Sequence, residues 1–119
     1  MHNYTELVVW QKAKALAVEL YALTDDFPKH EVFGLTQQIR RAVVSIPSNI
    51  AEGAGRSTNL DFCRFLDIAN GSSFEIETQL LIASELGYVK KEKLADIMLK
   101  IKEVQKSIFN LRKSFSKSG

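Results

Sequence analysis

Hydrophobic residues recur every three or four positions along most of the chain, and this spacing is typical of helices that bury one face. The first such segment covers about residues 6–24 and ends before Pro28, because proline cannot continue the helical hydrogen-bond ladder. The second segment starts near Gly34 and contains Pro47. Since Pro47 lacks an amide N–H, we expect a kink there, or a break, with Ser45 or water compensating the freed carbonyl.

The third segment starts after residues 57–59, where Thr58 followed by Asp61 resembles a capping box, and Gly87 is placed to end it in a left-handed conformation. In the fourth segment, hydrophobic residues alternate steps of three and four without exception. They are Leu94, Ile97, Ile101, Val104, Ile108, Leu111 and Phe115. Four amphipathic helices without a period-two strand predict an all-α fold, an antiparallel up-down-up-down four-helix bundle that forms one domain over residues 1–119.

Composition agrees with a globular protein, since 45% of the residues are hydrophobic and 25% are charged. The lone Cys63 lies among aromatic and aliphatic residues, so we expect a small buried thiol rather than a nucleophile. The N-terminus does not resemble a signal peptide, and no apolar segment approaches the roughly 18 residues that a membrane span requires. We therefore expect a cytoplasmic protein that is not embedded in a membrane.

Charge is distributed unevenly along the chain. Residues 90–119 contain nine Lys and Arg against three acidic residues, a net charge of +6, whereas residues 1–89 contain seven basic and eleven acidic residues, a net charge of −4. This imbalance favours either a polyanionic partner or packing of the basic segment against an acidic surface of the same protein.

Helix periodicity also predicts which residues face outward. On the second helix these are Arg41, Ser45, Ser48 and Glu52. On the third helix they are Arg64, Ile68, Gly71, Glu75, Thr78 and Ile82, with Phe74 and Leu81 beside them. Gly71 in a helix interior costs about 1 kcal/mol relative to Ala, so we expect a neighbouring subunit to approach closely there. The alternative is an ordinary surface with scattered apolar residues.

The fourth helix carries a row of lysines on the side away from its hydrophobic seam. This row consists of Lys102, Lys106, Lys113 and Lys117. Phosphates of a nucleic acid fit such a row, but amphipathic helices also need charged outer surfaces. Phe109 and Phe115 are better explained as core or interface side chains than as residues that stack on bases.

Chemical motifs are absent from the sequence. The two histidines, His2 and His30, lack the Glu-x-x-His spacing of di-metal bundles, and the serines lack a base partner. The glycine-rich segment 53–58 lacks the spacing and the lysine of a nucleotide-binding loop, although Arg56 within it remains a candidate phosphate contact. We therefore predict no enzyme activity, no metal and no cofactor.

Residues 38–53 read QIRRAVVSIPSNIAEG and continue into Gly55-Arg56. This stretch resembles the hallmark of the four-helix-bundle proteins encoded in intervening sequences of bacterial 23S ribosomal RNA. The similarity extends to residues 9–13 and to Gly71-Ser72, ETQL at residues 77–80 and Gly87-Tyr88, and it covers about four fifths of the chain. The resemblance implies a helical bundle that assembles as a ring-like homo-oligomer, a pentamer, with RNA association indicated by genomic context.

A related bundle, an accessory protein of diversity-generating retroelements, implies binding of nucleic acid together with a protein partner. The leading hypothesis is thus a non-catalytic homo-oligomer that binds structured RNA, such as ribosomal RNA, through the lysine row together with Arg40, Arg41 and Arg56. The alternative is a protein-interaction scaffold that binds no nucleic acid. In it, the stripe of Arg41, Ser45, Ser48 and Glu52 and the Gly71 face make subunit or partner contacts.

Overall fold

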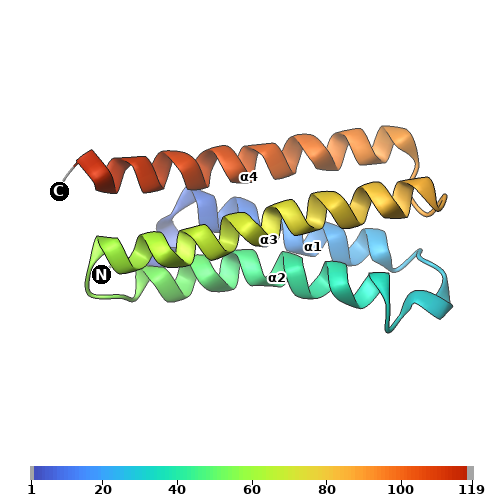
Figure 1. Cartoon of the computed structure of the whole chain (residues 1–119), viewed down its shortest axis with the longest axis horizontal. Helices are drawn as coiled ribbons and strands as arrows, with labels where there is room; N and C mark the ends of the chain where they lie inside the picture. Colours follow the sequence, from blue (N-terminus) through green and yellow to red (C-terminus); the bar gives the residue numbers. More distant parts are fainter. Residues whose placement is uncertain (1, 118–119) are drawn as a thin grey trace.

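The computed structural model describes residues 2–117 and consists of four long helices and two short 3-10 turns. The helices are α1 (Val8–Thr24), α2 (Leu35–Ala54), α3 (Asn59–Glu85) and α4 (Lys91–Lys117), and the turns are η1 (Tyr4–Glu6) and η2 (Lys29–Glu31). The helices lie along the long axis of a molecule of 47 × 24 × 20 Å, and consecutive helices run in opposite directions (Figure 1). The predicted all-α four-helix bundle is confirmed.

The ends of the helices follow local sequence signals. The Thr58 hydroxyl oxygen accepts a hydrogen bond from the Asp61 N–H at 3.1 Å and caps the start of α3, as predicted. Gly87 adopts the left-handed conformation with φ +84°, and the next residue, Tyr88, donates its N–H to the Ala83 carbonyl at 2.9 Å. These two caps set the length of α3.

Pro47 lies inside α2 without interrupting it, so the predicted alternative of a break is wrong. The Ser45 hydroxyl lies 2.9 Å from the Ser72 hydroxyl of α3 and accepts a hydrogen bond from the Asn49 amide at 2.9 Å. Ser45 therefore links α2 to α3 rather than compensating the carbonyl that Pro47 leaves without a donor.

The hydrophobic faces predicted for the four helices meet in one core. Its largest fully buried side chains include Leu20, Ile39, Ile46, Phe62, Leu66, Ile76, Leu80, Ile97 and Ile101. α2 packs most extensively against α3, and Gly53 is one reason. A Cβ atom at Gly53 would lie only 2.7 Å from both Phe62 Cδ1 and Phe65 Cβ, so the lack of a side chain lets the helices approach. Cys63 is half-buried rather than fully buried.

Candidate functional site

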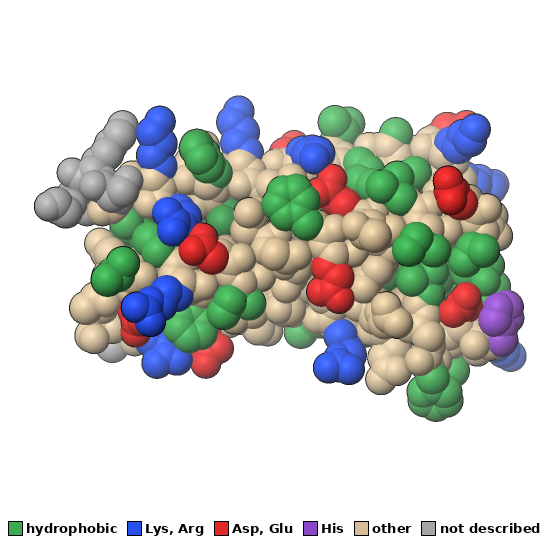
Figure 2. Space-filling view, in the orientation of Figure 1, with side chains coloured by type: hydrophobic (Ala, Val, Ile, Leu, Met, Phe, Trp, Pro, Cys, Tyr) green, Lys and Arg blue, Asp and Glu red, His purple; other side chains and the backbone are tan. Residues whose placement is uncertain are grey.

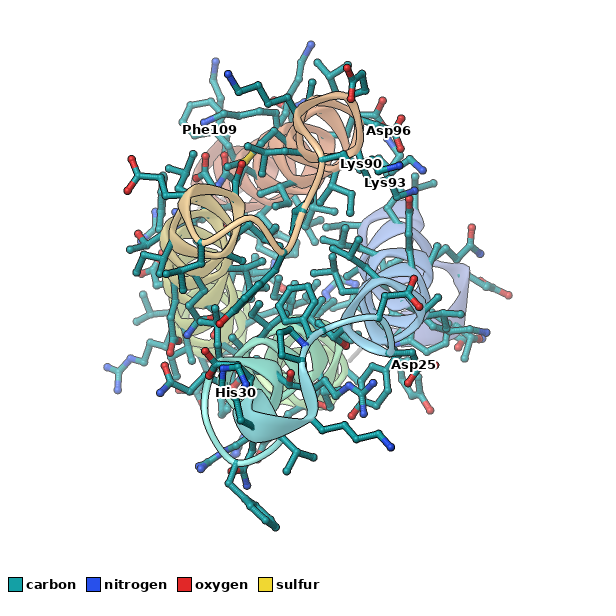
Figure 3. The ribbon with its side chains drawn as sticks, turned by 90° about the vertical axis from the view of Figure 1, so that its right-hand side faces the viewer. Asp25, His30, Lys90, Lys93, Asp96 and Phe109 are labelled. Atoms are coloured by element: carbon teal, nitrogen blue, oxygen red, sulfur yellow. The ribbon has the colours of Figure 1, made fainter. Side chains whose placement is uncertain are left out.

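The flank of α4 that faces α1 forms a cluster of ion pairs. Lys93 Nζ lies 3.1 Å from Glu19 Oε1, and Lys100 Nζ lies 2.8 Å from Glu19 Oε2. Asp96 adds a second carboxylate to both lysines, at 3.7 and 3.5 Å. Partial burial favours a raised pKa for Glu19, but the hydrogen bonds and charges of Lys100 and Lys93 outweigh it, so this pKa lies below its usual value. Figure 3 shows Lys93 and Asp96 together on this flank.

The opposite flank of α4, which faces α3, is also paired. Lys102 Nζ lies 3.0 Å from Glu77 Oε1, and the Gln105 amide donates to Glu77 Oε2 at 2.7 Å. Burial alone would raise the pKa of Glu77, yet Gln105 and Lys102 together hold it below its usual value. Further along α4, Arg112 Nε lies 2.7 Å from Asp67 Oδ1.

These ion pairs account for much of the charge asymmetry of the chain. Four of the basic residues of α4 pair with acidic residues of α1 or α3, namely Lys93, Lys100, Lys102 and Arg112. Of the two explanations that the sequence left open, packing against an acidic surface of the same protein therefore applies to both flanks. The outer side of α4 lies away from both of these paired flanks.

That outer side carries Lys106, Phe109 and Lys113, all exposed, and we call these three residues the outer ridge. Lys106 forms no ion pair with any residue that the structure describes. Phe109 is 62% exposed and lies on the opposite side of α4 from Asp96 (Figure 3), so it is not a core side chain, and its predicted alternative as an interface side chain stays a prediction. In Figure 2, basic and hydrophobic side chains lie beside each other along the upper edge, which α4 forms.

Two further candidate residues on α4 are Phe115 and Lys117. Phe115 is half-buried and packs against Phe62, with ring centroids 5.1 Å apart, which confirms its predicted core role. Lys117 is the last residue of α4, and its side chain lies outside the described part of the structure. In the described part of the structure, the predicted row therefore consists of Lys102, Lys106 and Lys113.

Arg40 and Arg56, which we predicted as RNA contacts, both make contacts within the bundle. Arg40 lies 2.8 Å from Asp25, donates to the Thr24 hydroxyl at 2.8 Å and lies over the Tyr21 ring at 4.6 Å. A groove between α1 and α2 runs past these residues. The guanidinium of Arg56 pairs with the Glu52 carboxylate at 3.5 Å and covers the Phe65 ring at 4.6 Å.

The outward stripe predicted on α2 is exposed at Arg41, Ser48 and Glu52, whereas Ser45 is half-buried against α3. Arg41 lines a polar groove between α2 and α3. This groove also contains Gln38, Ala42, Ser45, Ser72 and Glu75. The polar side chains of the stripe therefore lie directly beside the outer face of α3.

The outer face of α3 is apolar, as the helix periodicity predicts. Ile68 and Phe74 are each 52% exposed, and Leu81 and Ile82 are exposed to a similar degree. Gly71 lies between Ile68 and Phe74, and a Cβ atom placed on it would have no neighbour within 4 Å. Packing inside one chain therefore does not explain Gly71, in contrast to Gly53.

Phe33 is the most exposed of the large hydrophobic residues that the structure describes, and helix periodicity did not predict its exposure. Phe33, in the loop before α2, is 87% exposed and borders a groove between α1 and α2 that also contains Tyr21, Val32 and Val44. A loop residue has no helical periodicity that would predict its exposure. The local context shows only that Phe33 lies in the short segment between η2 and Gly34.

The described residues contain no group of three His, Cys, Asp or Glu side chains that could hold a metal ion. His30 lies at one end of the bundle (Figure 3), where its ring is 3.4 Å from the Tyr88 hydroxyl. That hydroxyl also donates to Glu31 at 3.0 Å, and Glu31 caps α2 by accepting the Leu35 N–H. These contacts join the two loops at this end of the bundle.

None of the described helices has the length and apolarity to cross a membrane.

The fold and its surfaces define a helical-bundle protein with exposed apolar and basic faces. The family model of the 23S rRNA-intervening sequence protein matches residues 5–110, and the chain belongs to this family. The bundle is similar to the crystal structure of a protein of unknown function from the S23 ribosomal protein family of Bacteroides thetaiotaomicron. The TM-score is 0.82 at 27% sequence identity, over 89% of this chain and 96% of that one. No curated protein matches the chain.

Proposed function

We propose that this protein is a non-catalytic homo-oligomeric bundle that binds structured RNA through the outer ridges of several α4 helices at once. The observation that carries the proposal is the exposure of Lys106 and Lys113, which are two helical turns apart on the side of α4 away from the core. The family takes its name from 23S rRNA intervening sequences, and the related Bacteroides protein from a ribosomal protein family. Ribosomal RNA is therefore the first nucleic acid to test.

Oligomerisation is part of the proposal because the ridge of one protomer is small. Each phosphate contact contributes about 0.9 to the slope of log affinity against log salt concentration on duplex nucleic acid, so two lysines give only weak binding. Several ridges on one assembly bind the same RNA with a high effective concentration. The binding energy then comes from the assembly rather than from one helix.

The outer face of α3 supports self-association. Ile68 and Phe74 leave apolar surface in water, and Gly71 between them allows a second backbone to come close. Arg41, Ser48 and Glu52 on α2, with Glu75 on α3, provide charged and polar groups beside this face. We assign these residues to the proposed subunit interface, and we propose five subunits, the number that the resemblance to the family implies.

Light scattering tests the interface. The protein is expected to have a mass of five times 13.4 kDa, and Ile68→Asp is expected to reduce it toward the mass of one chain. Val18→Asp is the matched control, because Val18 is also an exposed aliphatic residue but lies on α1. A monomeric unmodified protein at micromolar concentration contradicts the oligomer.

Fluorescence anisotropy with a ribosomal RNA fragment tests RNA binding. Affinity is expected to fall as salt rises and to fall further in the Lys106→Glu/Lys113→Glu double variant. Lys12→Glu/Lys29→Glu makes the same change of charge at exposed positions on α1 and η2 and serves as the control. An equal loss in both double variants means that net charge, not the ridge, determines binding.

The second candidate function is a protein-interaction scaffold without nucleic-acid binding. It is favoured by the groove between α1 and α2, where Phe33 and Val32 are exposed beside Tyr21. If the protein is oligomeric but binds no RNA at low or near-physiological salt, this function replaces the first.

A further inference from the structure

Phe109 is the uncharged residue of the outer ridge, so binding of phosphates does not explain why its side chain is exposed. Its ring is 62% exposed, and it makes no ring contact with another aromatic residue in the part of the chain that the structure describes. Lys106 precedes it by three positions and Lys113 follows it by four, so both lysines are its neighbours on the helix surface. A flat apolar ring is thus placed between two exposed ammonium groups.

The backbone that carries Phe109 is held against α3 on both sides. Four residues earlier, the Gln105 amide donates to the Ser73 hydroxyl at 3.0 Å and to Glu77 at 2.7 Å. Three residues later, Arg112 donates to both carboxylate oxygens of Asp67, at 2.7 and 3.2 Å. Binding to the ring therefore requires little ordering of the helix, which reduces the entropic cost of association.

We infer that Phe109 stacks on an unpaired base of the bound RNA while Lys106 and Lys113 contact phosphates on either side of that nucleotide. This inference rests on the proposed function and specifies its ligand: RNA with nucleotides in a loop, bulge or single strand, not an uninterrupted duplex. In an A-form duplex the base faces are covered by their neighbours, whereas unpaired bases are free to stack on aromatic side chains. Such stacking tolerates many sequences, because every base has a flat face.

Two RNAs of equal length separate this inference from simple phosphate binding. One is a hairpin with an unpaired loop that contains 2-aminopurine, and the other is a fully paired duplex. The unmodified protein is expected to bind the hairpin more tightly and to quench the fluorescence of 2-aminopurine. Phe109→Ala is expected to weaken hairpin binding about tenfold and to abolish the quenching, with little effect on the duplex. Phe109→Trp keeps a flat ring and is expected to retain both properties.

Phe33→Ala is the matched control, because it removes another exposed phenyl ring that lies away from α4. The inference is overturned if Phe109→Ala binds the hairpin normally, or if it lowers the mass of the oligomer, which would place Phe109 in a subunit contact. The proposed function survives both results, provided that Lys106→Glu/Lys113→Glu still weakens binding. If the unmodified protein binds neither RNA, the proposed function and the inference fail together.

Discussion

Lys102 Nζ lies 3.0 Å from Glu77 Oε1, so a lysine that faces outward by helix periodicity is held by a carboxylate of the neighbouring helix. Glu77 is the less exposed partner, with 15% of its side chain accessible against 60% for Lys102. The ammonium group therefore remains within reach of solvent while its charge is offset. Glu77 therefore offsets one positive charge of α4.

Glu77→Gln is expected to strengthen RNA binding. The change removes one negative charge per protomer and frees Lys102, while the Gln side chain still accepts a hydrogen bond from Gln105. Each phosphate that Lys102 then contacts should steepen the dependence of log affinity on log salt by about 0.9. Anisotropy titrations at several salt concentrations measure this slope. Glu85→Gln removes the same charge from an exposed position of α3 without releasing a lysine and should leave the slope nearly unchanged.

Acid is expected to destabilise the contact between α1 and α4 through Glu19. The pKa of Glu19 is lower in the folded protein than its usual value of 4.5, so its stabilising contribution is complete above that value. The contribution is lost as pH falls through the lower, folded-state pKa. Urea unfolding at neutral and acidic pH should show that Glu19→Gln costs about 1 kcal/mol at neutral pH and almost nothing in acid. Glu103→Gln, at an exposed acid of α4, is the control and should change stability by less than about 0.5 kcal/mol.

The glycines at positions 53 and 71 are expected to respond to alanine in opposite ways. Gly53→Ala should lower the free energy of unfolding by about 1–3 kcal/mol, because the new methyl group overlaps Phe62 and Phe65. Gly71→Ala should raise it by about 0.5–1 kcal/mol in the monomeric Ile68→Asp background, because the methyl group meets only solvent there. In the otherwise unmodified protein, the same change should weaken self-association, measured by light scattering on dilution. An unchanged oligomer would show that Gly71 lies outside the interface.

Arg40→Ala is expected to reduce stability without altering RNA binding. The variant loses a hydrogen bond to Thr24, an ion pair with Asp25 and the stacking on Tyr21, which together should cost about 1–3 kcal/mol. Thermal unfolding and the salt slope of RNA binding are the two measurements. Lys12→Ala, at an exposed position of α1, should change stability by less than about 0.5 kcal/mol. A shallower salt slope in Arg40→Ala would return Arg40 to the RNA contacts.

Most of the fold was predictable because helix formation leaves local signatures. The cap at Thr58, the left-handed Gly87 and the heptad seam of α4 all lie where the sequence indicates. The candidate site was less predictable. Periodicity shows that Lys102 and Phe109 face away from the seam, but it contains no information about Glu77 on another helix. It also left open whether Phe109 is a core or an interface side chain, and the structure places it outside the core.

The sequence by itself determined the number and the limits of the helices, the inward face of each and the excess of basic residues in the last one, since these depend on neighbours within one or two turns. Only the tertiary structure decided which charges remain for a partner. That outcome depends on which helix lies beside α4 and at what register, and so on distances between residues such as Glu19 and Lys100 that are far apart in sequence. The same packing explains Gly53 by its contact with Phe62 and leaves Gly71 open to solvent.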